Sequence, residues 1–570
     1  MSITSTPGEA AALERGRQAL SGGYSGQAAD IARTLLAANP QLAEAHRLLG
    51  MALQNIGHLD AAETSLREAI RLAPASSPAV VALSEVLVVT DRAREAVDIL
   101  APHAARTDAD IFILTAYAVA LKSLRRFAEA ATVYERARDV TPSSAVAEHN
   151  LAGLYGDLQR YAESLDSAQR AFAKGIDAPE TWVVRARALQ GLGRYDEAET
   201  AFREALRRRP GFAEAHGDLA QLIWMRTEDP KAAGQALDAA LRDMPGDIAL
   251  RAKKTQLNEY TGNPRLAYAT LGEAPAAVRA APLIEAHAAQ LASHFDPARA
   301  LGHAHRAYQA APDQHFVAVA LCQAQLAAGD PEGAARTALA MREKWPLDQH
   351  AIALLATAWR LMGVPAYREL YDYDHFVRAQ PIDSPAGWSS LDAYLGDLAK
   401  ALDRLHRLRT HPIGQSLRHG TQSLHGLRNS DDPVIRAFFP AIDGAIGAYL
   451  DGLGAGRDPL RGRNTGRYAF HGAWSVRLRP GGFHTDHVHQ QGWISSACHI
   501  VVPERIGEGH EGWLKFGEPG VPTLPRLQAE HFIKPEPGTL VLFPSYMWHG
   551  TVPFSGEDNR LSIAFDLLPT

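Results

Sequence analysis

One short stretch near the C-terminal end of the chain is unusually rich in side chains that can bind a metal. Residues 481–493 read GGFHTDHVHQQGW, and four metal-capable residues fall within six positions: His484, Asp486, His487 and His489. Neutral imidazoles, often with one carboxylate, are the ligands that suit a redox-active divalent ion such as Fe(II). The stretch therefore predicts a metal site, and the question is which of the four residues hold the ion.

The spacing of the four residues separates them into two pairs. On a regular strand alternate residues share a face, so His484 and Asp486 would point to one side and His487 and His489 to the other. We therefore expect only one pair to line a cavity. The first pair would give a site of two histidines and one carboxylate, whereas the second would give a three-histidine site, and the residues alone leave both open.

Two further residues with chemical potential follow at a distance. His549 stands 60 residues after His489, at the end of GTLVLFPSYMWHG, and Arg560 follows 11 residues later in RLSIAF. The planar guanidinium fork of arginine suits a carboxylate, which it binds through two parallel hydrogen bonds. Ser562 would share a strand face with Arg560 and could add a hydroxyl to the same carboxylate. The pattern thus combines a metal site with a position for an organic acid.

The segments that carry these residues have the sequence pattern of short strands. The run GAWSVRLRPGG alternates apolar and polar side chains, and WISSACHIVVP, GTLVLFPS and RLSIAFDLLP are short apolar runs that end at glycine or proline. Many short strands within about a hundred residues are typical of a jelly-roll barrel. Within it, Cys498, Trp513 and Phe516 are predicted to pack in the core.

The motifs together resemble the Fe(II)- and 2-oxoglutarate-dependent oxygenases. HVHQQGWISS, GTLVLFPSYMWHG and RLSIAF agree in order and spacing with a bacterial and phage group of these enzymes that carries a His-x-His motif, and the resemblance covers about residues 465–570. It implies a double-stranded β-helix that uses Fe(II), O2 and 2-oxoglutarate, with the keto acid oxidised to succinate and CO2.

The resemblance also implies roles for single residues. His487, His489 and His549 would bind the metal, while Arg560 and Ser562 would bind the far carboxylate of 2-oxoglutarate. His499 stands where related oxygenases often place a tyrosine that touches 2-oxoglutarate, and it is otherwise a core histidine. The commonest oxygenase pattern, His-x-Asp, is matched by residues 484–486, so His484 and Asp486 stay as alternative ligands.

The N-terminal part of the chain is repetitive. Pro40, Pro74, Pro142 and Pro210 are separated by 34, 68 and 68 residues, and Pro312 and Pro346 are again 34 apart. Each proline ends a helical segment, and small and large apolar residues recur at fixed places within the period. The segments resemble tetratricopeptide repeats, and we count about ten of them over residues 9–350. Such repeats stack into an α-solenoid with a concave groove, because none can bury its apolar face alone.

A connector of about a hundred residues joins the two parts. Residues 384–455 contain two runs with apolar residues at helical spacing, and between them lies a polar, glycine-rich segment, Gln415–Gln422, which is predicted to be a substrate lid or an interdomain loop. The predicted fold is thus multidomain, α plus β. Its parts are a repeat solenoid over residues 9–350, a helical connector over 351–464 and a jelly roll over 465–570.

Composition limits the partners and the compartment. The net charge of −6 and the pI near 6.5 argue against nucleic acid or an anionic membrane as the main partner. The two cysteines, Cys322 and Cys498, are too few for a disulfide framework, so a reducing compartment, the cytoplasm, is expected. The N-terminus has no secretory-signal pattern, and no apolar stretch is long enough to span a membrane.

The sequence therefore predicts an Fe(II)- and 2-oxoglutarate-dependent dioxygenase, most simply a hydroxylase. Repeat domains also occur in prolyl and aspartyl hydroxylases, and this analogy implies a peptide or protein substrate in the solenoid groove. One alternative is a small-molecule oxygenase whose repeats serve assembly. Another is a non-enzymatic repeat scaffold with a metal- or ligand-sensing jelly roll, against which Arg560 argues, since a metal sensor needs no cation for a keto acid.

Overall fold

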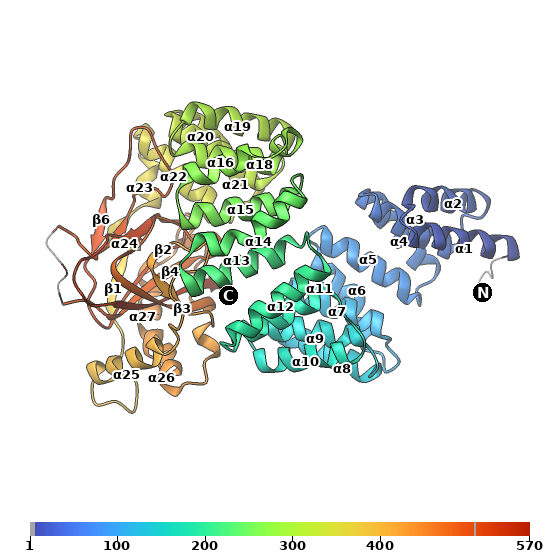
Figure 1. Ribbon diagram of the computed structural model, residues 1–570, viewed down its shortest axis with the longest axis horizontal. Coiled ribbons are helices and arrows are strands. Elements are labelled where there is room, and N and C mark those ends of the chain that lie inside the picture. Colours follow the sequence, from blue (N-terminus) through green and yellow to red (C-terminus); the bar gives the residue numbers. More distant parts are fainter. Residues whose placement is uncertain (1–5, 505, 507–508) are drawn as a thin grey trace. The chain divides into compact units, whose positions relative to one another are not determined.

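The computed structural model describes residues 6–504, 506 and 509–570 of the chain (Figure 1). The chain forms two compact units, Met1–Ala201 and Phe202–Thr570. The first unit is helical, and the second combines further helices with two antiparallel sheets. The predicted fold class, an α-solenoid followed by antiparallel strands, is confirmed.

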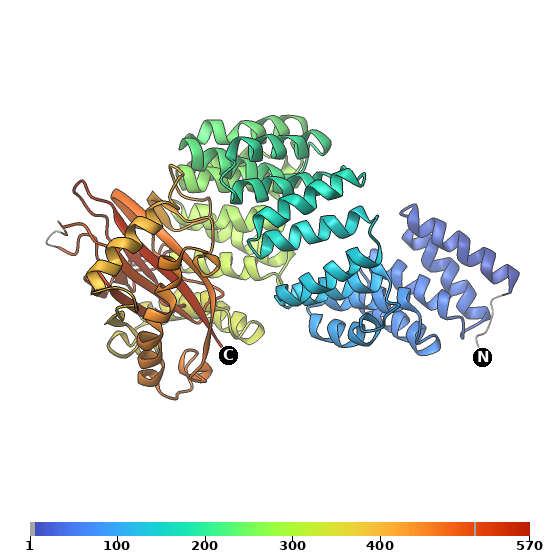
Figure 2. The same ribbon diagram turned by 90° about the horizontal axis from the view of Figure 1, so that it is seen from below.

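Helices that follow one another after short turns make up the first unit, drawn in blue to cyan in Figures 1 and 2. The last of them, α12, ends inside the second unit. Their bounds are α1 (Pro7–Ser21), α2 (Ser25–Ala38), α3 (Ala43–Asn55), α4 (Leu59–Leu72), α5 (Ser77–Val89), α6 (Ala93–Ala104), α7 (Ile111–Ser123), α8 (Phe127–Val140), α9 (Ala145–Asp157), α10 (Tyr161–Ala173), α11 (Pro179–Gly191) and α12 (Tyr195–Arg208).

Small residues let the repeat helices approach one another closely. On α4, Ala62 and Leu66 are fully buried, and a Cβ at Gly50 on α3 would lie only 2.5 Å from the Cγ atom of Leu66. The 34-residue period is consistent with this packing: a small residue on one helix lies against a larger apolar side chain of the next helix. In the described residues, α1–α16 and α18–α21 form ten helix pairs, in agreement with the predicted number of repeats.

The second unit continues with repeat helices and then with helices of the connector. The repeat helices are α13 (Ala213–Thr227), α14 (Pro230–Asp243), α15 (Ile248–Thr261), α16 (Pro264–Gly272), α17 (Ala276–Arg279), α18 (Pro282–Ser293), α19 (Pro297–Ala310), α20 (His315–Ala328), α21 (Pro331–Lys344) and α22 (Gln349–Met362). The later helices are α23 (Ala366–Leu370), α24 (Tyr373–Phe376), α25 (Leu391–Asp403), α26 (Pro433–Arg436) and α27 (Phe438–Leu453), with single 3-10 turns at Leu427–Asn429 and Arg461–Arg463.

The strands form two antiparallel sheets. The larger sheet has the order β1-β7-β4-β9-β3-β2, and the smaller has the order β6-β5-β8. Between β4 and β9 the chain passes repeatedly from one sheet to the other, as in a jelly roll. Their bounds are β1 (Arg378–Pro381), β2 (Leu417–Gln422), β3 (Tyr468–His484), β4 (Ile494–Val501), β5 (Leu514–Phe516), β6 (His531–Ile533), β7 (Thr539–Pro544), β8 (His549–Thr551) and β9 (Arg560–Pro569).

The segment Gln415–Gln422 differs from its prediction. It is neither a lid nor an interdomain loop, because residues 417–422 form strand β2 at the edge of the larger sheet and pair with β3. A bulge between Arg418 and Gly420 breaks the alternation that usually reveals a strand in a sequence. Strand β1, in the connector, pairs with β7 at the other edge and was not predicted either.

The last repeat helices share one hydrophobic core with the sheets. This core contains Cys322 and Leu355 from α20 and α22, Phe438 from α27, and Cys498 and Phe565 from β4 and β9. Both cysteines are free and buried, as the prediction for Cys498 requires. Among the helices of the described residues, none combines the length and the apolar character that a membrane-spanning segment requires.

A buried hydrogen bond connects the repeat helix α22 to Trp548, which directly precedes strand β8. The indole Nε1 of Trp548 donates to the hydroxyl of Thr357 on α22 at 2.9 Å, and both side chains are buried. Since a buried donor that loses its acceptor costs about 1–3 kcal/mol, this contact contributes to holding α22 against the smaller sheet.

We predict that Thr357→Val lowers the free energy of unfolding of the second unit by about 1–3 kcal/mol, because the indole N–H of Trp548 is left without an acceptor. Urea denaturation followed by tryptophan fluorescence measures the change. The matched control is Thr255→Val, since within the described residues the buried Thr255 hydroxyl has one contact, a hydrogen bond to the Arg251 carbonyl of its own helix. Equal losses in the two variants would contradict the prediction.

Candidate metal centre and active site

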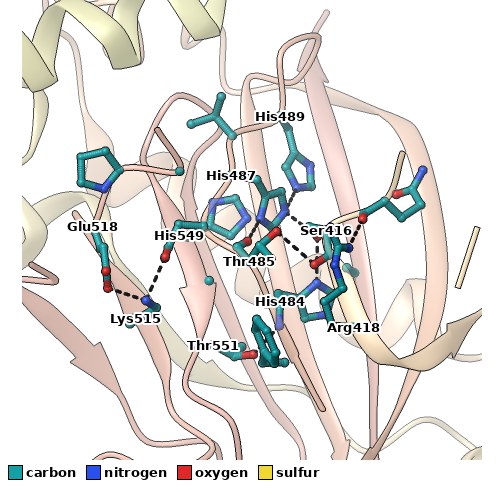
Figure 3. A pocket seen from close by; sticks show the side chains of 18 of the residues that line it. Ser416, Arg418, His484, Thr485, His487, His489, Lys515, Glu518, His549 and Thr551 are labelled. Carbon is teal, nitrogen blue, oxygen red and sulfur yellow. Dashed lines mark hydrogen bonds and ion pairs between the residues drawn. The ribbon is translucent and has the colours of Figure 1, made fainter. Parts of the chain in front are cut away.

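A cavity of about 1380 Å³ opens within the second unit, and it contains the histidine-rich stretch (Figure 3). Its walls come from the inner face of β3 and β9, from the chain just after β3, and from the loop after β5. Repeat helices complete it, with Glu259 and Tyr260 at the end of α15 and His294 just after α18. The cavity is therefore shared by the sheets and the repeats of one unit.

The backbone holds His487 and His549 directly opposite each other. The N–H of each donates to the carbonyl of the other, at 2.9 and 3.1 Å, so that His487 forms an isolated antiparallel bridge with the first residue of β8. The N–H of His489 donates to the Ser545 carbonyl at 3.0 Å. The three rings consequently gather side by side, as Figure 3 shows, with centroids 4.2 to 5.1 Å apart.

Each of the three imidazoles has an outward hydrogen bond at Nδ1. His487 donates to the Thr485 carbonyl at 2.8 Å, His549 donates to the Met547 carbonyl at 2.9 Å, and His489 lies 2.6 Å from a carboxylate oxygen of Asp566. Because these oxygens only accept, the proton of each neutral ring is at Nδ1 and the lone pair is at Nε2. One nitrogen from each ring lies within 4.8 Å of the other two.

Two of the three rings, His487 and His549, hold a proton weakly. Burial and the neighbouring His489 lower the pKa of His487 to about 3, and burial holds the pKa of His549 well below its usual range. The Nε2 atoms of His487 and His489 lie 3.2 Å apart, so two lone pairs face each other at hydrogen-bond distance. Neutral, converging imidazoles of this kind fit a divalent transition metal, whose ligands must be unprotonated.

Asp566 orients one of the three rings, and the sequence analysis missed it. Its carboxylate accepts from Nδ1 of His489 and from the Ser495 hydroxyl at 2.7 Å. Burial opposes the ionised form, yet these partners keep the pKa of Asp566 below its usual range. For His489 burial likewise opposes the charge, but Asp566 outweighs it and raises the pKa. A carboxylate behind a ligand histidine is a recurrent device for fixing the ring.

The alternation along β9 could have revealed Asp566. Four residues that alternate on this strand line the cavity: Arg560, Ser562, Ala564 and Asp566. The prediction that Arg560 and Ser562 share a face is thus consistent with the cavity lining, and the same period of two extends to Asp566.

The alternative pair lies beside the cluster but has other partners. Asp486 accepts a hydrogen bond from Lys515 at 2.9 Å, and Lys515 also pairs with Glu518. Burial raises the pKa of Asp486 to about 6 although Lys515 opposes the shift. His484 Nδ1 lies 2.9 Å from the Ser416 hydroxyl. Neither residue belongs to the group whose ligand atoms converge.

The expectation that only one of the two pairs lines the cavity is wrong. His484 and Asp486 line it together with His487 and His489. Strand β3 ends at His484, and the chain beyond it is irregular apart from the bridge at His487, so alternate residues no longer point to opposite faces. Ser416, which the sequence analysis did not single out, lies 3.2 Å from Nε2 of His487 and next to this irregular segment.

Arg560 lies deep in the same cavity without a carboxylate partner in the part of the chain that the structure describes. It is buried, its Nη1 donates to the Gly512 carbonyl at 2.7 Å, and its Nη2 lies 3.2 Å from Nδ1 of His499. Its Nε has no partner in the described residues, nor has Nε2 of the fully buried His499. Burial lowers the pKa of Arg560 to about 10. A buried cation without a counter-ion is costly, so this environment favours an anionic ligand.

Family models match both parts of the chain. Residues 472–566 match the model described as "Putative 2OG-Fe(II) oxygenase". Residues 43–76 and 183–248 match models described as tetratricopeptide repeat. The predicted resemblances are thus confirmed, and the oxygenase match covers the cluster, Arg560 and Asp566. Together with the three converging histidines, this match supports an enzyme of the oxygenase type.

Among curated proteins, none is similar enough to this chain to match it.

Solved structures similar to this chain include two repeat proteins. Yeast Tom70 is 12% identical, covers 70% of this chain and 97% of its own, and superposes with a TM-score of 0.36. TTC0263, a thermophilic TPR protein of Thermus thermophilus, is 22% identical, covers 32% of this chain and 98% of its own, and has a TM-score of 0.29.

We predict that His489→Ala abolishes the binding of Mn(II) at micromolar concentration, because it removes one of three converging nitrogens. Asp486→Asn is the matched comparison and should keep the affinity of the wild type within about threefold, since an amide can still accept from Lys515. Isothermal calorimetry measures both variants. Loss of metal in Asp486→Asn with retention in His489→Ala would instead assign the site to His484, Asp486 and His549.

Proposed function

We propose that this protein is an Fe(II)- and 2-oxoglutarate-dependent oxygenase that hydroxylates a peptide or protein substrate. The observation that carries the proposal is the combination, in one cavity, of three converging imidazoles and a buried guanidinium without a counter-ion in the described residues. A site for metal alone would leave Arg560 unexplained, and a site for an acid alone would leave the histidines unexplained.

In this proposal His487, His489 and His549 hold Fe(II) through Nε2. When bound together with 2-oxoglutarate and O2, the ion supplies the oxidising power that removes a hydrogen atom from an unactivated carbon. The chain supplies orientation, because each outward Nδ1 hydrogen bond fixes a ring, and the Asp566 carboxylate makes His489 a stronger electron donor. Three protein ligands would leave positions of the ion open for the keto acid and O2.

Arg560 and Ser562 would bind the far carboxylate of 2-oxoglutarate. The guanidinium offers its free Nε to a carboxylate, and its Nη1 bond to the Gly512 carbonyl fixes the plane of the fork. Ser562 lines the cavity on the same face of β9 and can add a hydroxyl donor. His499 then acts on Arg560 rather than on the acid, since its Nδ1 accepts from Nη2.

The walls of the cavity support a peptide or protein as the substrate. Tetratricopeptide repeats generally mediate protein interactions, and two residues of α15, Glu259 and Tyr260, line the same cavity as the metal-capable cluster. A chain bound along these repeat helices could enter the cavity from that side. The volume of about 1380 Å³ exceeds what 2-oxoglutarate alone would need.

We predict that Arg560→Ala weakens the binding of 2-oxoglutarate by about 10- to 150-fold, the equivalent of losing one charge-assisted pair of about 1.5–3 kcal/mol. Mn(II) affinity should stay unchanged, which separates this loss from unfolding. Calorimetric titration of the Mn(II)-loaded protein measures it. Arg560→Lys is the control and should recover part of the affinity, because it restores the charge but not the planar fork.

The wild-type protein with Fe(II), ascorbate and O2 should also convert 2-oxoglutarate slowly into succinate without any added substrate. If the metal-loaded protein neither binds nor consumes 2-oxoglutarate, the oxygenase proposal fails and a metal- or ligand-sensing role takes its place.

A further inference from the structure

Arg418 is a second guanidinium of the cavity that has no carboxylate within ion-pair distance in the described residues. It lies on strand β2 and lines the cavity near His484 (Figure 3). Its Nη1 donates to the carbonyls of Gln415 and Leu417, at 2.7 and 2.8 Å. Its Nε and Nη2 make no hydrogen bond within residues 6–504, 506 and 509–570, so they remain as donors for a bound group.

The backbone around Arg418 is distorted in a way that fixes its direction. The pairing of β2 with β3 shifts between Arg418 and Gly420, and His419 between them has a positive φ of 52°. A Cβ at Gly420 would lie 2.5 Å from the Arg477 carbonyl, so only glycine fits there. Bulges of this kind re-aim a side chain at the edge of a sheet, and a strained residue near a site needs surrounding support.

A repeat helix also holds the guanidinium. The Cζ atom of Arg418 lies 5.5 Å from the centroid of the Tyr260 ring, at the end of α15. A cation over an aromatic face is held by the ring quadrupole, and the contact leaves the edge of the guanidinium free for a planar acceptor. The repeats thus contribute to the cavity a residue that positions a cation of the sheet.

The charged and titratable neighbours of Arg418 compensate its charge only in part, because none of the described carboxylates forms an ion pair with it. Glu259 is the acidic residue that influences it, and its carboxylate pairs with His287 at 3.0 Å. His411, His419 and His484 are the other titratable groups on that side, and none of them carries a negative charge. Half-burial of an unpaired cation is unfavourable in free energy, and an anion that enters the cavity would relieve it.

We infer that Arg418 recognises a carboxylate of the substrate, such as an acidic side chain of a peptide, and that Tyr260 positions it. This inference rests on the proposed function, in which Arg560 serves the carboxylate of 2-oxoglutarate. The cavity then has two places for anions, a deep one for the cosubstrate and an outer one, beside the repeats, for the substrate. The substrate class is therefore an acidic peptide.

The test uses the full-length protein loaded with Mn(II) and the 2-oxoglutarate analogue N-oxalylglycine. The probes are N-acetyl-aspartate amide and its uncharged counterpart N-acetyl-asparagine amide, observed by saturation-transfer NMR and by the broadening that Mn(II) causes. The aspartate probe should bind and be broadened, and the asparagine probe should bind at least about tenfold more weakly.

Matched variants show whether Arg418 and Tyr260 are responsible for binding the aspartate probe. Arg418→Gln should weaken binding of the aspartate probe by about tenfold or more, whereas Arg407→Gln, at an exposed arginine outside the cavity lining, should leave it unchanged. Tyr260→Leu should weaken it by about two- to fivefold, and Tyr260→Phe should restore it because the ring face is kept.

The inference is overturned if Arg418→Gln binds the aspartate probe as the wild type does, or if the asparagine probe binds equally well. Preference for a phosphoserine probe over aspartate would overturn the carboxylate assignment in favour of a phosphate. Failure of the wild type to bind Mn(II) or N-oxalylglycine would instead overturn the proposed function. Saturation transfer is also recorded on the metal-free protein with and without the Arg418→Gln change, so the two failures are distinguishable.

Discussion

The outward hydrogen bonds of three histidines are the constraint on which the site depends. Each Nδ1 has an oxygen that can only accept, so each Nε2 lone pair faces the same point, and two of these atoms are 3.2 Å apart. Nitrogen lone pairs at this distance are compatible with a shared cation or proton between them. The sheets hold the three rings in this converging arrangement, and the fold can be understood as its support.

The support comes from several elements at once. The backbone bridge between His487 and His549 joins the irregular chain after β3 to the smaller sheet, and Asp566 on β9 fixes His489 from the larger sheet. Trp548, next to His549, is held by Thr357 of the last repeat helix. Repeats and sheets share one core, so the repeats in this unit are part of the site's scaffold.

Much of this arrangement could be predicted from local pattern. The 34-residue spacing of prolines and the alternation along β9 are short-range signals, and they led to the repeats and to the shared face of Arg560 and Ser562. Asp566 obeys the same alternation and could have been found. The irregular backbone at Asp486 could not, because it depends on partners far away in the sequence, namely Lys515, Ser416 and the bridge to His549. Strand β2 was missed since its bulge removes the period of two and glycine-rich polar sequence resembles a loop.

The central claim, that three imidazoles hold the ion and Arg560 holds the acid, is tested most directly by a crystal structure of the protein with Mn(II) and N-oxalylglycine, with the metal located by its anomalous scattering. We predict one ion bonded to Nε2 of His487, His489 and His549, and the far carboxylate of the analogue paired with Arg560. An ion bonded to Asp486, or an analogue whose carboxylate lies away from Arg560, would contradict the claim.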